Sequence, residues 1–203
     1  MPSLADDHTA FARETTRLTE ILTSTALLAP AHRKFIAEIA MLRLAILVEN
    51  SMRSVFCKLV CGATYIDGSA PIVLAQQRNI PAAISAMQNF NRPKFRYSLP
   101  WNDGAEIRDN IRFLIDPADQ CHQQLRNYAS FLTEVRYLRN HIAHRNQNSR
   151  KNFVKLIRKY YGARVPGVTC GNLLVSPRVS PRRPLLVTYL VTANVMMKDV
   201  VRA

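Results

Sequence analysis

The chain has 203 residues, of which 48% are hydrophobic and 21% charged, and this balance excludes the highly charged, apolar-poor composition of disordered chains. Lysine and arginine number 28 against 14 aspartate and glutamate residues, so the formal net charge of +14 favours a polyanionic partner. The length and the apolar content predict a single folded domain over residues 1–203.

The first part of the chain is predicted to form two long helices. Apolar residues recur at helical spacing over residues 6–28, and Pro30 is expected to close this helix. The same spacing continues over residues 31–61 without an internal proline or glycine, and Gly62 is a suitable C-cap. Charged residues interrupt the second helix too often for a membrane span, so we expect no membrane partner.

The rest of the chain is predicted to alternate short helices with loops. We expect a loop over 62–79, a helix over 80–89 capped by Asn79, and extended chain over 92–101. A helix capped by Asn102 or Asp103 should end at Ile115, and the next helix should span 117–146 with a break near Asn127. A short basic helix capped by Asn148 or Ser149 should end at Tyr161, and an irregular connection should follow over 162–184. Residues 185–201 form the last element, where we favour a helix although β-branched residues leave a strand open. The predicted fold class is an all-α bundle.

The four cysteines, Cys57, Cys61, Cys121 and Cys170, match no zinc or disulfide spacing. Cys57 and Cys61 lie one helical turn apart among apolar residues, where a thiol behaves as a small hydrophobe, so we expect both in the core. No cofactor or metal is therefore expected. Residues 1–16 include several charged side chains and lack the apolar stretch of a signal peptide, which favours the cytoplasm.

The residues from Glu134 to Asn146 carry the side chains best suited to chemistry. At ~100° per residue the helix has two faces: an apolar stripe of Phe131, Val135, Leu138 and Ile142, and a polar face of Arg136, Asn140 and His144. Arg139 falls between these faces. One helix alone is therefore not expected to bring Arg139 and His144 together.

A dense run of basic residues surrounds this helix and continues beyond it. Residues 136–164 include no acidic residue, and their basic residues are Arg136, Arg139, Arg145, Arg150, Lys151, Lys155, Arg158, Lys159 and Arg164. Basic residues often cover a solvated helix face, and histidines near a helix end can simply complement its dipole. The density of the cluster instead favours phosphate binding. Tyr160 and Tyr161 could stack on bases, although packing is the commoner use of such a pair.

The run from Arg139 to His144 resembles the R-x4-6-H motif of the HEPN superfamily, in which a polar residue, often asparagine, follows the arginine. Here four residues separate Arg139 from His144, and Asn140 supplies the polar residue. The resemblance implies a helical bundle, a homodimer through the motif helix and metal-independent cleavage of RNA.

In that function His144 acts as general acid or base on the ribose 2′-hydroxyl, Arg139 stabilises charge on the phosphate, and Asn140 orients one of them. Supporting or RNA-binding roles are expected for Arg136, His141, Arg145, Arg150, Lys151, Lys155, Arg158 and Lys159. DNA is spared because it has no 2′-hydroxyl.

Several alternatives stay open in the sequence. Arg136 and His141 have the same spacing, although Tyr137 stands where the family usually has asparagine. The chain could bind RNA or nucleotides without cutting them, or could act with a partner such as an antitoxin in a defence system. On the long helix, Glu49, Asn50 and Arg53 could face the motif or form a buried ion pair.

Overall fold

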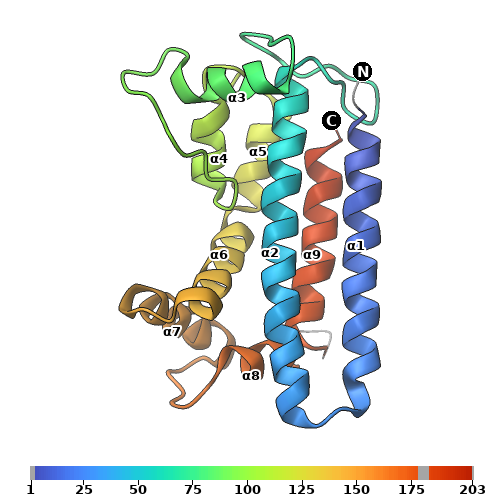
Figure 1. Cartoon of the computed structure of the whole chain (residues 1–203), viewed down its shortest axis with the longest axis vertical. Helices are drawn as coiled ribbons and strands as arrows, with labels where there is room; N and C mark the ends of the chain where they lie inside the picture. Colours follow the sequence, from blue (N-terminus) through green and yellow to red (C-terminus); the bar gives the residue numbers. More distant parts are fainter. Residues whose placement is uncertain (1–2, 178–182, 203) are drawn as a thin grey trace.

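Three long helices run side by side and form the body of the protein (Figure 1). In this computed structural model, residues 3–177 and 183–202 are described, and within them the chain is α-helical with no named β-strand. The long helices are α1 (Leu4–Ser24), α2 (Pro30–Val60) and α9 (Leu185–Val200). Each contacts the other two, and α2 also packs against α6 and α8. The predicted all-α fold class is confirmed.

Three short helices cover one end of this body. They are α3 (Ile80–Asn89), α4 (Gly104–Ile111) and α5 (Gln120–Asn127). The loop that precedes α3 is held by hydrogen bonds from Ile66 N to Val201 O (2.9 Å) and from Leu74 N to Leu114 O (2.8 Å). The loop predicted over residues 62–79 is therefore confirmed.

The remaining helices lie at the other end, beside the first half of α2. They are α6 (Ala129–His144), α7 (Gln147–Tyr161) and α8 (Cys170–Val175). The apolar stripe of α6 packs inward as predicted, with Val135 and Leu138 buried and Phe131 and Ile142 partly buried against the core. This packing leaves the polar side of α6 at the surface.

Several predicted boundaries were wrong, and backbone geometry gives the reasons. Pro30 opens α2 because proline suits the first helical position, where no N–H is needed. The helix predicted to start at Pro117 begins at Gln120, capped by the Asp119 carboxylate, and it breaks at Tyr128 as expected near Asn127. The helix capped by Asp103 ends at Ile111, four residues earlier than predicted.

The C-terminal third also differs in part from the sequence prediction. The connection predicted as irregular contains α8, whose N-cap Thr169 accepts a hydrogen bond from Asn172 N at 3.2 Å. Residues 178–182 of that connection lie outside the described part of the chain. The last element is helical, so the strand alternative for residues 185–201 is wrong.

The core contains three of the four cysteines. Cys57, Cys121 and Cys170 are buried, Cys61 is half-buried, and all four are free thiols. Burial raises the pKa of Cys57 to about 11, so its thiol stays protonated at neutral pH. Among the described residues, no group of three or more His, Cys, Asp and Glu side chains is arranged to hold a metal ion. Over the same residues no helix combines the length and the apolar character that crossing a membrane requires.

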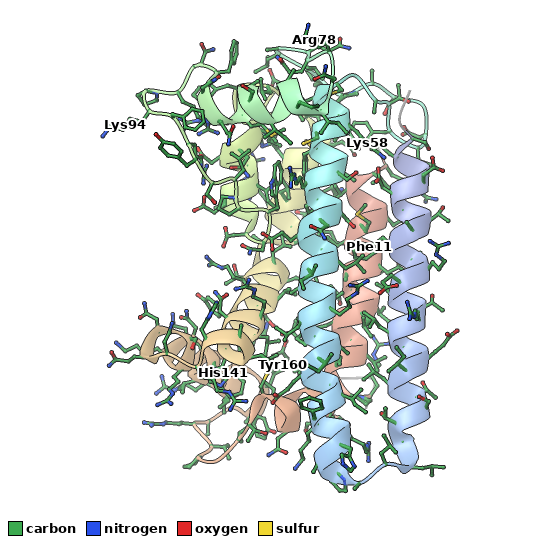
Figure 2. All side chains as sticks on the ribbon, viewed as in Figure 1. Phe11, Lys58, Arg78, Lys94, His141 and Tyr160 are labelled. Atoms are coloured by element: carbon green, nitrogen blue, oxygen red, sulfur yellow. The ribbon has the colours of Figure 1, made fainter. Side chains whose placement is uncertain are left out.

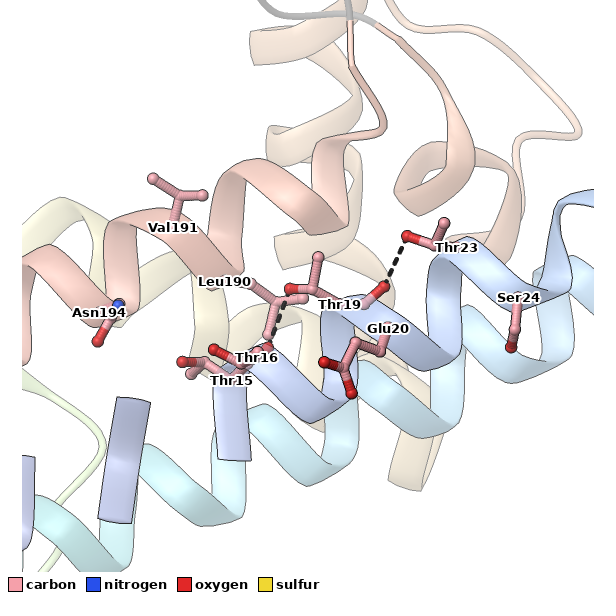
Figure 3. Close-up of a pocket in the computed structure, with 9 residues that line it drawn as sticks. All are labelled: Thr15, Thr16, Thr19, Glu20, Thr23, Ser24, Leu190, Val191 and Asn194. Carbon is pink, nitrogen blue, oxygen red and sulfur yellow. Dashed lines mark hydrogen bonds between the residues drawn. The ribbon is translucent and has the colours of Figure 1, made fainter. Parts of the chain in front are cut away.

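A cavity of about 540 Å³ forms a groove between α1 and α9 (Figure 3). Four of the five hydroxyl side chains on its α1 wall bond back to their own helix, including Thr19 Oγ1 to Thr15 O (2.9 Å) and Thr23 Oγ1 to Thr19 O (3.0 Å). Because these donors are already used, the groove presents mainly methyl groups. Glu20 is its only charged lining residue among those described.

Candidate functional site

The side chains of Arg139, Asn140 and His144 meet at the C-terminal end of α6. Arg139 Nη1 lies 3.0 Å from Asn140 Oδ1 and 3.2 Å from His144 Nε2. The expectation that one helix cannot bring Arg139 and His144 together was therefore wrong. Five residues of helix rise only ~7.5 Å, and the long arginine side chain spans that distance along the surface.

The end of α6 is fixed immediately after this cluster. Arg145 adopts a left-handed conformation with φ of 44°, and its N–H bonds to His141 O at 3.3 Å. Asn146 then caps α7, because its side chain accepts a hydrogen bond from Ser149 N at 2.8 Å. The caps predicted at Asn148 and Ser149 were thus two or three residues too late. The early end of α6 makes His144 its last residue and leaves its ring exposed.

The hydrogen bonds define what this cluster can offer an anion. The two N–H groups of Arg139 Nη1 face two acceptors, Asn140 Oδ1 and, in the tautomer that carries its proton on Nδ1, His144 Nε2. Among the described residues, Nε and Nη2 of Arg139 have no hydrogen-bond partner. That edge of the guanidinium matches the geometry of two phosphate oxygens.

His141 belongs to the interface between α6 and α7. Its ring stacks on Phe153 with centroids 4.2 Å apart and planes 8° from parallel. Burial, followed by the charge of Arg145, lowers the pKa of His141 below the ordinary imidazole value, and Arg150 adds to this while Glu38 opposes it. His141 is therefore neutral at pH 7, and it supports the motif by packing.

The second Arg–His pair is not brought together. Arg136 forms an ion pair with Asp103, the N-cap of α4, at 2.9 Å, and its guanidinium lies over the Tyr137 ring. His141 instead contacts Phe153. The two side chains of the alternative motif thus serve separate helix contacts, which favours the pair Arg139 and His144.

The helix α7 carries the basic surface predicted from the sequence. Its inner face buries Phe153, Leu156 and Ile157, and its outer face exposes the cations Arg150, Lys151, Lys155 and Arg158. Within the described residues, none of these four has a carboxylate within 4.0 Å. Lys155 lies beside Asn152 Oδ1 and over the Tyr137 ring. The outer face of α7 is therefore a row of cations without acidic partners.

Besides Arg136, two more of the predicted basic residues are partly neutralised. Arg145 lies 3.8 Å from Glu38 of α2, and Lys159 forms an ion pair with Glu134. Both cations keep more than half of their side chain exposed, so these pairs reduce the positive potential without removing it.

A buried carboxylate whose role was not predicted from the sequence connects three helices. Glu134 of α6 accepts hydrogen bonds from the hydroxyls of Tyr160 of α7 and Tyr189 of α9, both at 2.6 Å, and from Lys159. Burial alone raises the pKa of Glu134, but these hydrogen bonds outweigh it and hold the pKa below its ordinary value. The signal in the sequence is that Glu134 lies between Phe131 and Leu138 on the apolar stripe.

This network decides the position of Tyr160. Its hydroxyl bonds to Glu134 and lies 3.1 Å from the Tyr189 hydroxyl, so Tyr160 holds α7 in place and is not available to stack on bases. Tyr161 is also partly buried against the core. The packing alternative for this tyrosine pair is the one the structure supports.

The polar group on α2 lies apart from the motif. Glu49, Asn50 and Arg53 line a cavity of about 350 Å³ between α2, α3 and the loop that follows α3. Asn50 and Arg53 are exposed, so the buried ion pair was wrong. The cavity that this group lines includes no residue of the motif.

Comparisons of the chain with protein-family models, with curated proteins and with solved structures found no significant match. The geometry of the motif and of the basic surface beside it therefore carries the functional proposal.

Proposed function

We propose that this protein cleaves RNA at the cluster of Arg139, Asn140 and His144 without the help of a metal ion, as a HEPN-type endoribonuclease of the cytoplasm. The single observation that carries the proposal is the contact of one guanidinium nitrogen with both Asn140 Oδ1 and His144 Nε2 at an exposed helix end. A guanidinium and an imidazole held together in this way supply the two functions that transesterification of RNA needs.

In the proposed step, the bound phosphate takes over the Arg139 N–H that lies against His144 Nε2, and the freed Nε2 takes the proton of a ribose 2′-hydroxyl. The O2′–P bond forms, the P–O5′ bond breaks, and the proton ends on the leaving O5′. Arg139 stabilises the negative charge that develops on the non-bridging oxygens, and Asn140 fixes the orientation of Arg139 by accepting its N–H. The products are a 2′,3′-cyclic phosphate and a 5′-hydroxyl.

The unpartnered cations of α7 support RNA as the polyanion. They lie on the helix that directly follows the motif and packs against α6. Counterion release from such a surface supplies affinity that does not depend on sequence. The same surface supports a second candidate function, RNA binding without cleavage.

A homodimer is part of the proposal, because a second copy could complete the site. The outer face of α2 exposes Phe35, Ile39 and Ile46 at helical spacing. Glu38 of the same helix contacts Arg145, which directly follows the motif. An apolar surface next to the motif is suited to a second copy of the chain.

The test is incubation of the purified protein with end-labelled RNA in EDTA. Wild type should cleave the RNA, and His144→Ala and Arg139→Ala should each lower the rate roughly 100-fold or more. His141→Ala serves as the matched control, because it removes the other motif histidine and should change folding stability more than chemistry.

Other outcomes of this test separate the candidate functions. RNA binding by all variants without cleavage by wild type would establish the non-catalytic alternative. Products with a 5′-phosphate would contradict attack by the 2′-hydroxyl. Light scattering that finds only monomers at micromolar concentration would remove the homodimer from the proposal.

A further inference from the structure

The loop between α3 and α4 displays two aromatic rings to solvent. Tyr97 is 88% exposed and Phe95 is 47% exposed, and their rings meet edge to face with centroids 4.8 Å apart. Exposed Lys94 precedes them, and Figure 2 shows it pointing away from the body of the protein. Aromatic rings with a cation beside them form a surface on which bases stack.

The loop is held rigidly although its aromatic rings face water. Arg92 donates to Met87 O at 2.6 Å and pairs with Asp109 at 3.1 Å, while Arg96 pairs with both Asp109 and Glu106. Further bonds run from Arg96 N to Gln88 O (2.8 Å) and from Gln88 Nε2 to Tyr97 O (3.5 Å). These contacts fix the backbone on both sides of Tyr97, so a ligand can bind without first ordering the loop.

Tyr97 stands at the rim of the 350 Å³ cavity that Glu49, Asn50 and Arg53 line. This volume lies at the small end of the ~300–1,000 Å³ range of small-molecule sites. Ile84, Leu99 and buried Trp101 supply an apolar wall, and Gln88 and Ser98 add polar atoms. The lining therefore combines a flat apolar surface with amide, carboxylate and guanidinium groups, which are the partners of a base edge and a phosphate.

We propose that this cavity binds an unpaired base of RNA, with the base stacked on Tyr97, its edge bonded to Asn50, Glu49 or Gln88, and the adjoining phosphate on Arg53 or Lys94. The assignment of RNA as the ligand rests on the function proposed above. Cleavage itself is not required for the cavity to bind.

The position of the cavity supports a ligand that also reaches the motif. Glu38, which contacts Arg145, and Glu49, which lines the cavity, are 11 residues apart on α2. That spacing is close to three full turns, so both lie on one face about 16 Å apart. Figure 2 shows Lys94 and His141 on the same side of α2. About five stacked nucleotides, at roughly 3.4 Å each, span this distance.

Trp101 allows a direct test, because it is the only tryptophan of the sequence and it lines the cavity. A 12-nucleotide 2′-O-methyl RNA, which lacks the attacking hydroxyl, is titrated as a single strand and as a duplex while Trp101 fluorescence is recorded. We expect the single strand to quench the fluorescence of wild type. Tyr97→Ala should raise Kd roughly tenfold, and Tyr97→Phe, which keeps the ring, should bind nearly as wild type does.

The matched control is Leu27→Ala, which removes a 98% exposed apolar side chain in the turn between α1 and α2 and should leave Kd unchanged. Equal affinity of Tyr97→Ala and wild type would overturn the proposal, as would an equal loss of affinity for the duplex, whose bases are not available to stack. Failure to quench Trp101 would also overturn it. Because the probe cannot be cleaved, these results do not depend on whether wild type is a nuclease.

Discussion

Arginines gather at two corners of this protein, and their surroundings differ completely. At the loop between α3 and α4, Arg92, Arg96 and Arg112 all pair with the Asp109 carboxylate. On α7, Arg150 and Arg158 have no carboxylate within 4.0 Å among the described residues, although they are just as basic. Net charge alone does not separate the two groups. Acidic partners convert the first group into a structural clamp and leave the second as a binding surface.

The largest effect expected from this difference is on folding. Arg92 is 6% exposed in its side chain, so Arg92→Ala takes a donor from the carbonyl oxygens of Met87, Asp109 and Asn110, while the Asp109 carboxylate keeps Arg96 and Arg112. We expect the free energy of unfolding to fall by ~2–4 kcal/mol, below the value for fully buried pairs because Asp109 is partly exposed. Urea unfolding measures it. Arg150→Ala is the control and should change stability by less than ~0.5 kcal/mol. An equal loss of unfolding free energy in both variants would mean that the two groups of arginines do not differ in structural role.

The unpartnered cations of α7 should make RNA binding depend strongly on salt concentration. Replacing Arg150, Lys151 and Arg158 by alanine should weaken binding roughly tenfold at moderate salt and flatten the slope of log K against log salt by about 2, at ~0.7 per lost contact with a single strand. Filter binding at several salt concentrations measures this slope. The double variant Arg13→Ala/Arg17→Ala, on exposed positions of α1, should keep the wild-type slope. An unchanged slope in the triple variant would mean that α7 does not contact RNA.

Helical spacing and caps were enough to predict most of the helices, because burial of an apolar stripe and capping are local properties. Asn79 as the cap of α3 is an example, with Asn79 Oδ1 accepting from Ala82 N at 2.9 Å. The ends of the helices were harder to predict from the sequence. Nothing in the sequence indicates that Arg145, which is not a glycine, takes a left-handed conformation and ends α6 at His144.

The candidate site was predicted by residue type but not by contact. The angles of an ideal helix separate Arg139 from His144, and only the length of the arginine side chain closes the gap. Glu134 was missed for a related reason, since its partners Tyr160 and Tyr189 come from other helices. The acids that neutralise Arg92 and Arg96 are also distant in sequence. Partners of this kind require the tertiary structure.

The smallest expected effect is a change in the pKa of His141, which reports the positive potential around Arg145 and Arg150. Burial first, and then Arg145 and Arg150, hold its pKa below the ordinary value of about 6.5. Since the unfolded chain binds this proton more readily, stability is lost as the pH falls from 7 through that value. Removing Arg150 should raise the pKa of His141, as measured by NMR titration of its ring. Arg96→Ala should leave that pKa unchanged, because Arg96 is neutralised by Asp109 and Glu106 at the other end of the protein. A pKa that responds equally to both changes would mean that the unpartnered cations create no local field at the motif.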